Sequence, residues 1–167
     1  MTKSIETDIL IIGAGPVGLF TVFEAGLLGL KCHLVDNLDK IGGQCIELYP
    51  EKPIYDIPGV PNQTGKEHID SLLKQIEPFD YEVHLNQRVD KIEESGDYWI
   101  AETTDGISFK TLNIFIAAGA GSFEPRKPPV ESPDKFLGKG IDYAVRSVDK
   151  YKDKDIVIFG GGDSALD

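Results

Sequence analysis

The sequence predicts an α/β fold in which helices cover a parallel β-sheet, and three observations support this prediction. Residues 8–12 form a short apolar run that stops at a glycine, as a buried parallel strand does. A glycine-rich turn and a largely apolar segment, residues 16–30, follow directly and predict a buried helix. Residues 31–35 are predicted to form a second strand, which ends at Asp36. Strand, helix and strand thus succeed one another within a single unit.

The turn of this unit has the pattern G-x-G-x-x-G. Its first glycine permits a tight turn, its second lets the backbone approach a pyrophosphate, and its third lets the helix pack close to the strand. Free N–H groups at the helix N-terminus then favour an anion. An acidic residue at the end of the second strand suits the ribose hydroxyls of an adenosine and disfavours the 2′-phosphate of NADP. The predicted binding residues are Gly13, Ala14, Gly15, Pro16, Gly18 and Asp36.

A second helix and an antiparallel meander are predicted for the rest of residues 1–120. Thr64 and Glu67 form a capping-box pair before residues 65–77, whose apolar positions have helical spacing. Beyond this helix we expect a short strand at 82–85, a meander at 89–93, 98–103 and 107–111, and a buried strand at 113–118. The fold class is therefore a Rossmann-like nucleotide-binding domain with an inserted β-meander.

The remaining residues predict a linker and the start of a second Rossmann-like domain. Prolines and glycines concentrate in residues 124–140, which is typical of a connection between domains. Residues 155–159 predict a buried strand, followed by a second glycine turn and the first turn of a helix. We therefore divide the chain into a first domain (1–120, incomplete), a linker (121–154) and a truncated second domain (155–167), and expect a fragment of a longer protein. The expected binding residues of the second domain are Gly160, Gly162, Asp163 and Ser164.

Charge and composition exclude several classes of function. The net charge of −11 opposes binding to nucleic acid or to an anionic membrane. No stretch approaches the ~20 apolar residues of a membrane span. The apolar run near the N-terminus follows Glu6 and Asp8 rather than basic residues, and glycines interrupt it, which argues against a signal peptide. We expect a cytoplasmic protein with no nucleic-acid or membrane partner.

A long loop rich in glycine and proline separates the first unit from the second helix. Its residues 42–59, GGQCIELYPEKPIYDIPG, resemble the flavin loop of the thioredoxin-reductase-like ferredoxin–NADP reductases. Residues 114–119, IFIAAG, resemble the strand that closes the FAD domain in that superfamily. Residues 160–165, GGGDSA, resemble the start of the family's NADPH domain. The resemblance extends over all 167 residues.

The resemblance implies a function, cofactors and partners. It implies an oxidoreductase that carries electrons from NADPH through FAD to ferredoxin or flavodoxin, and we expect a homodimer when the protein is full length. By the same resemblance, Asp36 holds the adenosine ribose, Gly43 and Gln44 wrap the ribityl chain or flavin edge, Tyr49 packs at the isoalloxazine ring, Val89 meets the adenine through its backbone, and Phe123 lies by the flavin. No catalytic acid or base and no metal site is predicted, and His33, His68 and His84 are interpreted as structural.

Two cysteines, Cys32 and Cys45, test whether the chain carries a redox dithiol. Glutathione-reductase-like enzymes place two cysteines five positions apart after the glycine pair, but the second position here is Pro50. Thioredoxin reductases place C-x-x-C just before the second glycine motif, and residues 140–155 contain no cysteine. This absence favours an external one-electron acceptor. Two alternatives stay open: a thioredoxin-type disulfide reductase, and a flavin-binding module without turnover.

Overall fold

A six-stranded sheet forms the centre of the computed structural model, which describes residues 3–121, 127–162 and 165. The strand order is β5-β2-β1-β8-β7-β6. Its strands are β1 (Lys3–Ile12), β2 (Cys32–Val35), β5 (Tyr81–His84), β6 (Val89–Ser95), β7 (Tyr98–Thr103) and β8 (Ile107–Ile116). Two further short strands, β3 (Pro53–Ile54) and β4 (Gln63–Thr64), pair with each other outside this sheet.

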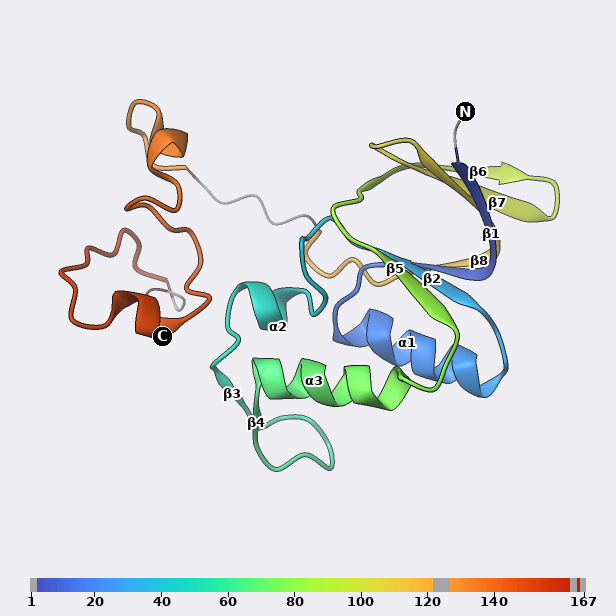
Figure 1. Cartoon of the computed structure of the whole chain (residues 1–167), viewed down its shortest axis with the longest axis horizontal. Coiled ribbons are helices and arrows are strands. Elements are labelled where there is room, and N and C mark those ends of the chain that lie inside the picture. The colour runs from blue at the N-terminus through green and yellow to red at the C-terminus, as the bar shows by residue number, and fades with distance from the viewer. Residues whose placement is uncertain (1–2, 122–126, 163–164, 166–167) are drawn as a thin grey trace.

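The sheet is parallel on one side of the molecule and antiparallel on the other. Strand β1 pairs in parallel with both β2 and β8, and β2 pairs in parallel with β5. Strands β6, β7 and β8 form the antiparallel meander. Helices α1 (Pro16–Leu27) and α3 (Gly65–Ile76) lie together below the parallel strands (Figure 1), and α2 (Gln44–Glu47) is a single turn near the start of α3. The predicted α/β, Rossmann-like fold with an inserted meander is confirmed.

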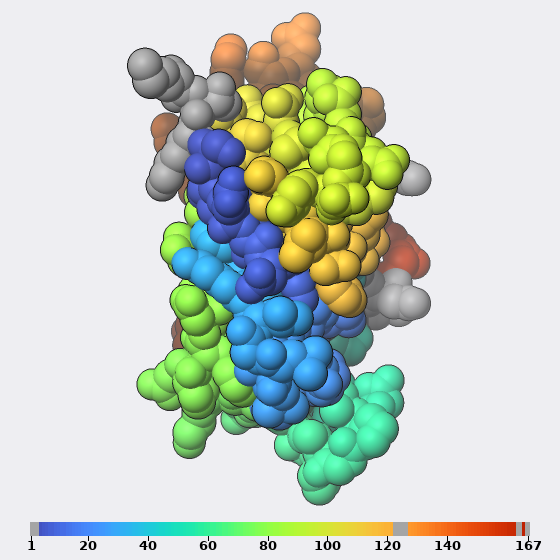
Figure 2. Space-filling view, turned by 90° about the vertical axis from the view of Figure 1, so that its right-hand side faces the viewer, coloured from blue at the N-terminus to red at the C-terminus, as the bar shows by residue number. Residues whose placement is uncertain are grey.

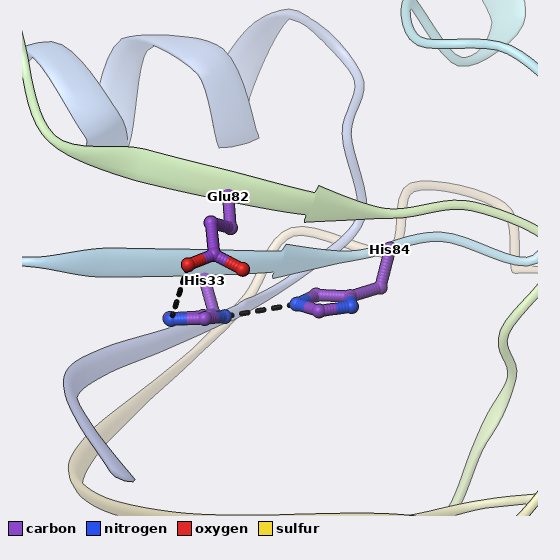
Figure 3. A group of neighbouring side chains, drawn as sticks. All are labelled: His33, Glu82 and His84. Carbon is purple, nitrogen blue, oxygen red and sulfur yellow. Dashed lines mark hydrogen bonds and ion pairs between the residues drawn. The ribbon is translucent and has the colours of Figure 1, made fainter. Parts of the chain in front are cut away.

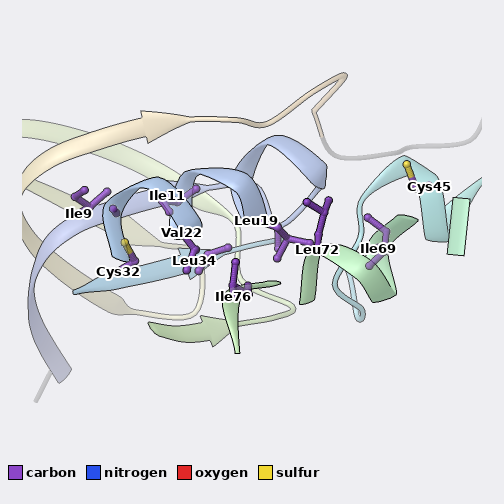
Figure 4. Close-up of a cluster of buried hydrophobic side chains, with 12 residues drawn as sticks. Ile9, Ile11, Leu19, Val22, Cys32, Leu34, Cys45, Ile69, Leu72 and Ile76 are labelled. Carbon is purple, nitrogen blue, oxygen red and sulfur yellow. The ribbon is translucent and has the colours of Figure 1, made fainter. Parts of the chain in front are cut away.

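A single apolar cluster holds the two helices against the parallel strands (Figure 4). Strand residues such as Ile11 and Leu34 pack in it with Leu19 of α1 and with Ile69 and Ile76 of α3. All five side chains are at most 1% exposed. Burying one such side chain stabilises the fold by roughly 1.5–3 kcal/mol. This packing fixes the carboxyl ends of the strands, where the nucleotide site was predicted.

Strand β8 is one continuous strand, so the prediction of two separate strands at 107–111 and 113–118 is wrong. It pairs antiparallel with β7 along its first half and in parallel with β1 along its whole length, from Lys3 opposite Ile107 to Ile12 opposite Ile116. Because the polar first residues of β1 find partners on β8, β1 also begins earlier than its apolar run. In Figure 2 these residues (dark blue) lie beside the meander, whose strand β8 is gold.

Local signals explain where the helices begin and end. Helix α1 ends at Leu27 rather than residue 30 because the chain turns back at Gly29, which has φ +71°, and the Leu30 N–H donates to the Ala25 carbonyl. The predicted capping box of α3 is confirmed: Thr64 Oγ1 accepts the Glu67 N–H, while Glu67 Oε2 accepts the Thr64 N–H. Among the described residues, no helix has the length and apolar character that a membrane span requires.

Residues 127–162 contain two short 3-10 helices, η1 (Pro133–Phe136) and η2 (Val148–Tyr151), and no regular strand. The strand predicted at residues 155–159 is not formed, and Val157 and Phe159 are 79% and 91% exposed. A strand needs a neighbour for its backbone hydrogen bonds, and none of the described residues pairs with this segment. The division of the chain into domains at residues 120 and 154 stays a prediction.

Candidate dinucleotide site at the carboxyl ends of the parallel strands

A cavity of about 540 Å³ opens where the carboxyl ends of the parallel strands meet. The chain leaves β1 towards β2 on one side, and β8 lies on the other side, so this is the point where the strand order reverses. Open α/β sheets bind their ligands at such switch points. The lining residues are Ile12, Gly13, Gly15–Val17, Val35–Leu38, Gly43–Cys45, Glu47–Tyr49, Gln87–Val89 and Ala117–Gly121.

The glycine turn forms one wall of the cavity. The Gly13 N–H donates to the Val35 carbonyl at 2.8 Å. A Cβ on Gly18 would lie 1.9 Å from the Gly13 carbonyl oxygen, so only glycine permits this contact between helix and turn. Helix α1 starts at Pro16 with Gly15 as its N-cap, and no side chain caps it. The first N–H groups of α1 therefore remain available to an anion in the cavity.

The Asp36 carboxylate ties this turn to the next loop. Its Oδ2 accepts the Ala14 N–H at 2.7 Å and its Oδ1 accepts the Leu38 N–H at 2.9 Å. Each carboxylate oxygen can accept a further hydrogen bond. Asp36 therefore both shapes the turn and keeps acceptor capacity on the cavity wall, which suits the hydroxyls of a ribose.

The loop that resembles a flavin loop meets the glycine turn through glycines. The Gly42 N–H donates to the Ala14 carbonyl at 2.9 Å. Gly43 has φ +56°, and a Cβ there would lie 3.1 Å from the Gly15 Cα. The two backbones can approach this closely because neither glycine carries a side chain. Gln44, which follows at the start of α2, lines the cavity.

Tyr49 and Cys45 lie together on the cavity wall. Their side chains are hydrogen-bonded, and burial raises the pKa of the Cys45 thiol and the pKa of the Tyr49 hydroxyl. The pKa of Cys32, in β2, is raised to about 11, first by burial and then by Asp8 and Asp80. Both thiols are therefore protonated at neutral pH, and both are free cysteines.

Gln87 also lines the cavity, and the sequence analysis did not predict it as a site residue. Its N–H donates to the Asp36 carbonyl at 2.9 Å. Its side-chain Nε2 donates to Asp105 Oδ2 at 3.1 Å, and its Oε1 accepts the Thr103 hydroxyl at 2.8 Å. Gln87 thereby joins the loop after β2 to the turn between β7 and β8. The available signal was its position just after β5, at the edge of the sheet that also carries Gly13 and Asp36.

The structure brings most of the predicted binding residues of the first domain to this one cavity. Gly13, Gly15, Pro16, Asp36, Gly43, Gln44, Tyr49 and Val89 line it. Ala14 and Gly18 are buried behind the wall and act through their backbone. Gly160 and Gly162 are exposed and are not among the lining residues. Phe123, Asp163 and Ser164 lie outside the described residues.

An arginine from residues 127–162 reaches the rim of the cavity. The Arg146 guanidinium pairs with Glu47 Oε2 at 2.5 Å and with Asp39 Oδ1 at 3.6 Å. Glu47 lies on α2 and lines the cavity, and its side chain is 13% exposed. The ion pair therefore attaches this segment to the loop that carries Gln44.

The fold and the cavity together define a Rossmann-like nucleotide-binding domain. The profile of one family, the pyridine nucleotide-disulphide oxidoreductases, matches residues 7–167. The chain belongs to that family.

Among individual proteins, the chain is similar to ferredoxin–NADP reductases. The chain is 56% identical to a ferredoxin–NADP reductase of Bradyrhizobium sp., covering 100% of this chain and 49% of the relative. It is 55% identical to the ferredoxin–NADP reductase of Pelagibacter ubique, covering 98% of this chain and 48% of the relative. The chain thus spans about half the length of these relatives.

Solved structures of related enzymes share the fold. A thioredoxin reductase of Lactococcus lactis matches with a TM-score of 0.64 and 26% identity, over 83% of this chain and 43% of that chain. A ferredoxin-flavin thioredoxin reductase of Clostridium acetobutylicum matches with a TM-score of 0.58 and 26% identity, over 84% of this chain and 46% of that chain.

Proposed function

We propose that this chain is the FAD-binding part of a reductase that carries electrons from NADPH to ferredoxin or flavodoxin. The observation that carries the proposal is the cavity at the switch point, where the uncapped N-terminus of α1, the Asp36 carboxylate and Gln44 converge. The names of the relatives that are 55–56% identical support the same activity. A homodimer of the full-length protein stays a prediction.

The residues present fit an FAD molecule along the length of the cavity. The glycine turn and the N-terminus of α1 suit the pyrophosphate, because no side-chain cap occupies the first N–H groups of the helix. Asp36 would bind the adenosine ribose and Val89 would border the adenine. Gln44 and Tyr49 would border the ribityl chain and the flavin ring. Bound FAD would supply the electron-transfer chemistry, namely acceptance of a hydride from NADPH and release of single electrons.

In this proposal the protein's own residues bind and orient FAD, and its two thiols take no part in electron transfer. Burial raises the pKa of both Cys32 and Cys45, so neither provides a thiolate at neutral pH. Pro50 occupies the position where a partner for Cys45 would stand in a glutathione-reductase-like dithiol. An external one-electron carrier is therefore favoured over a disulfide substrate as the acceptor.

A protein with the full length of the relatives allows a direct test of this function. We expect it to bind FAD and to reduce a ferredoxin with NADPH as the electron donor, as monitored by the absorbance of the ferredoxin. The same preparation should show little NADPH-dependent reduction of thioredoxin in a thiol-coupled assay. Rapid disulfide reduction with negligible ferredoxin reduction would favour the disulfide-reductase alternative. A bound flavin that NADPH does not reduce would favour a binding module.

A further inference from the structure

Two histidines and a glutamate meet on the sheet face opposite α1 and α3 (Figure 3). In β2, the neighbours of His33, Cys32 and Leu34, point into the core between the sheet and α1, so the alternation of a strand puts His33 on the other face. Glu82 is the register partner of His33 on β5, and His84 follows Glu82 by two positions. All three side chains therefore lie on one face, with Glu82 and His84 on the edge strand.

The potential ligand atoms of these side chains are close together. His33 Nδ1 and His84 Nε2 are 2.9 Å apart, and His33 Nε2 is 4.0 Å from Glu82 Oε1. One ligand atom from each residue can be chosen so that all lie within 4.8 Å of one another. His33 is 2% exposed, and the Phe109 ring packs against both imidazoles with centroids 6.0 and 5.1 Å away. The Phe109 ring therefore covers one side of the group, and the exposed Glu82 side chain borders solvent at the sheet edge.

Two imidazoles and a carboxylate are ligands that zinc binds at about 2.0–2.2 Å, which puts donor atoms roughly 3.3 Å apart in tetrahedral geometry. The two rings would separate by a few tenths of an ångström from their present 2.9 Å. The Glu82 side chain is 56% exposed and would turn away from Lys31, its neighbour at 3.6 Å.

We propose that His33, Glu82 and His84 form a site for a divalent transition metal of the zinc class, with its fourth position open to water at the β5 edge. His33 would bind through Nδ1 and His84 through Nε2, with the proton of His84 on its Nδ1. The His84 carbonyl accepts the Asp36 N–H at 3.0 Å. A metal joining β2 to β5 would therefore also brace the strand end that carries Asp36.

Cobalt titration of the metal-free chain tests the site, because tetrahedral Co²⁺ absorbs visible light. We expect the wild type to bind one equivalent of Co²⁺ and Zn²⁺ to displace it. The variants His84→Gln and Glu82→Gln, both on the edge strand, should each weaken binding at least ~10-fold. His68→Gln is the matched control, since His68 is a half-buried histidine of α3 that hydrogen-bonds Gln63. It should bind Co²⁺ as the wild type does.

Thermal unfolding gives a second readout that does not depend on the flavin site. Zn²⁺ should raise the unfolding midpoint of the wild type and of His68→Gln, and should leave that of His84→Gln unchanged. Circular dichroism of each variant would establish that it is folded. A folded wild type without the visible cobalt bands, or equal affinities in wild type and His84→Gln, would overturn the proposal. FAD binding in the same samples reports separately on the proposed function.

Discussion

At the residue scale, the Asp36 carboxylate shapes the glycine turn and is also the proposed ribose contact. It accepts N–H groups from Ala14 and Leu38, which fixes the shape of the glycine turn. It also faces the cavity, where its remaining lone pairs would accept ribose hydroxyls. A substitution at Asp36 would therefore change the turn as well as the proposed ribose contact, and a test must separate the two effects.

Replacing Asp36 by alanine should lower FAD affinity at least ~10-fold, because a hydrogen bond to a charged group contributes about 1.5–3 kcal/mol. Flavin fluorescence titration would measure this affinity. FMN has no adenosine, so its affinity should change much less than that of FAD. Glu94→Ala, on exposed β6, controls for loss of a carboxylate. Unchanged FAD affinity would refute a ribose contact at Asp36, and an equal loss for FMN would indicate an effect on the turn alone.

Exchanging the donor and the acceptor of the hydrogen bond between Gln87 and Asp105 tests whether this contact positions the site. Gln87→Glu removes the N–H that Asp105 accepts and puts two carboxylates together, so it should weaken FAD binding through the Asp36 loop. Adding Asp105→Asn restores a donor opposite the new carboxylate and should recover most of the affinity. Fluorescence titration of the wild type, both single variants and the double variant gives the coupling. Additive losses would show that this contact does not position the site.

The contrast between Asp36 and Gln87 shows how far the sequence could predict the site. Asp36 was predicted because its spacing from the glycine turn follows from the geometry of one strand–helix–strand unit. The role of Gln87 depends on contacts with Thr103 and Asp105, which only the pairing of the meander brings near. No local pattern carries that information.

At the element scale, the differences between prediction and structure come from pairing. The sequence around Leu112 suggested two strands, yet β8 runs through it because β1 offers a continuous partner. The apolar run at 155–159 suggested a strand, yet it lacks a partner among the described residues. In contrast, the start of α3 was predicted correctly because its capping box is a local interaction of Thr64 with Glu67.

The capping box predicts a pH dependence of stability. The hydrogen bonds from Thr64 hold the pKa of Glu67 below its usual 4.5. A depressed folded-state pKa means that the stabilisation is complete above about pH 4.5 and is lost as the pH falls through the lower folded value. In the Glu67→Gln variant, the urea concentration at the unfolding midpoint should therefore fall less steeply as the pH is lowered below about 4.5. Glu94→Gln is the control, and an equally flat profile there would refute the assignment to the cap.

At the scale of the whole molecule, the route of electrons should not depend on the cysteines. In a protein of the full length of the relatives, the double variant Cys32→Ala, Cys45→Ala should keep most NADPH-dependent reduction of ferredoxin. Alanine avoids placing a hydroxyl at these two buried positions. A loss above ~100-fold with flavin still bound, about 2.7 kcal/mol in the barrier, would favour the disulfide-reductase alternative. Flavin absorbance in the same samples gives the bound fraction.

The nicotinamide site should need more structure than residues 155–162 provide in this chain. Ile156, Val157 and Phe159 are 57%, 79% and 91% exposed, and the segment has no sheet partner among the described residues. A nucleotide site of the predicted kind needs its first strand held in a sheet and a second βα unit for the ribose contact. This chain spans about half the length of its relatives.

We therefore expect the 167-residue chain, loaded with FAD, to show no saturable reduction of its flavin by NADPH, and a protein of the relatives' full length to show it. Anaerobic stopped-flow absorbance of the flavin band distinguishes the two cases, because a true site gives a rate that saturates with NADPH concentration. A rate that rises linearly would indicate collision without binding. Saturation at micromolar NADPH in the 167-residue chain would place the nicotinamide site within these residues and contradict the predicted second domain.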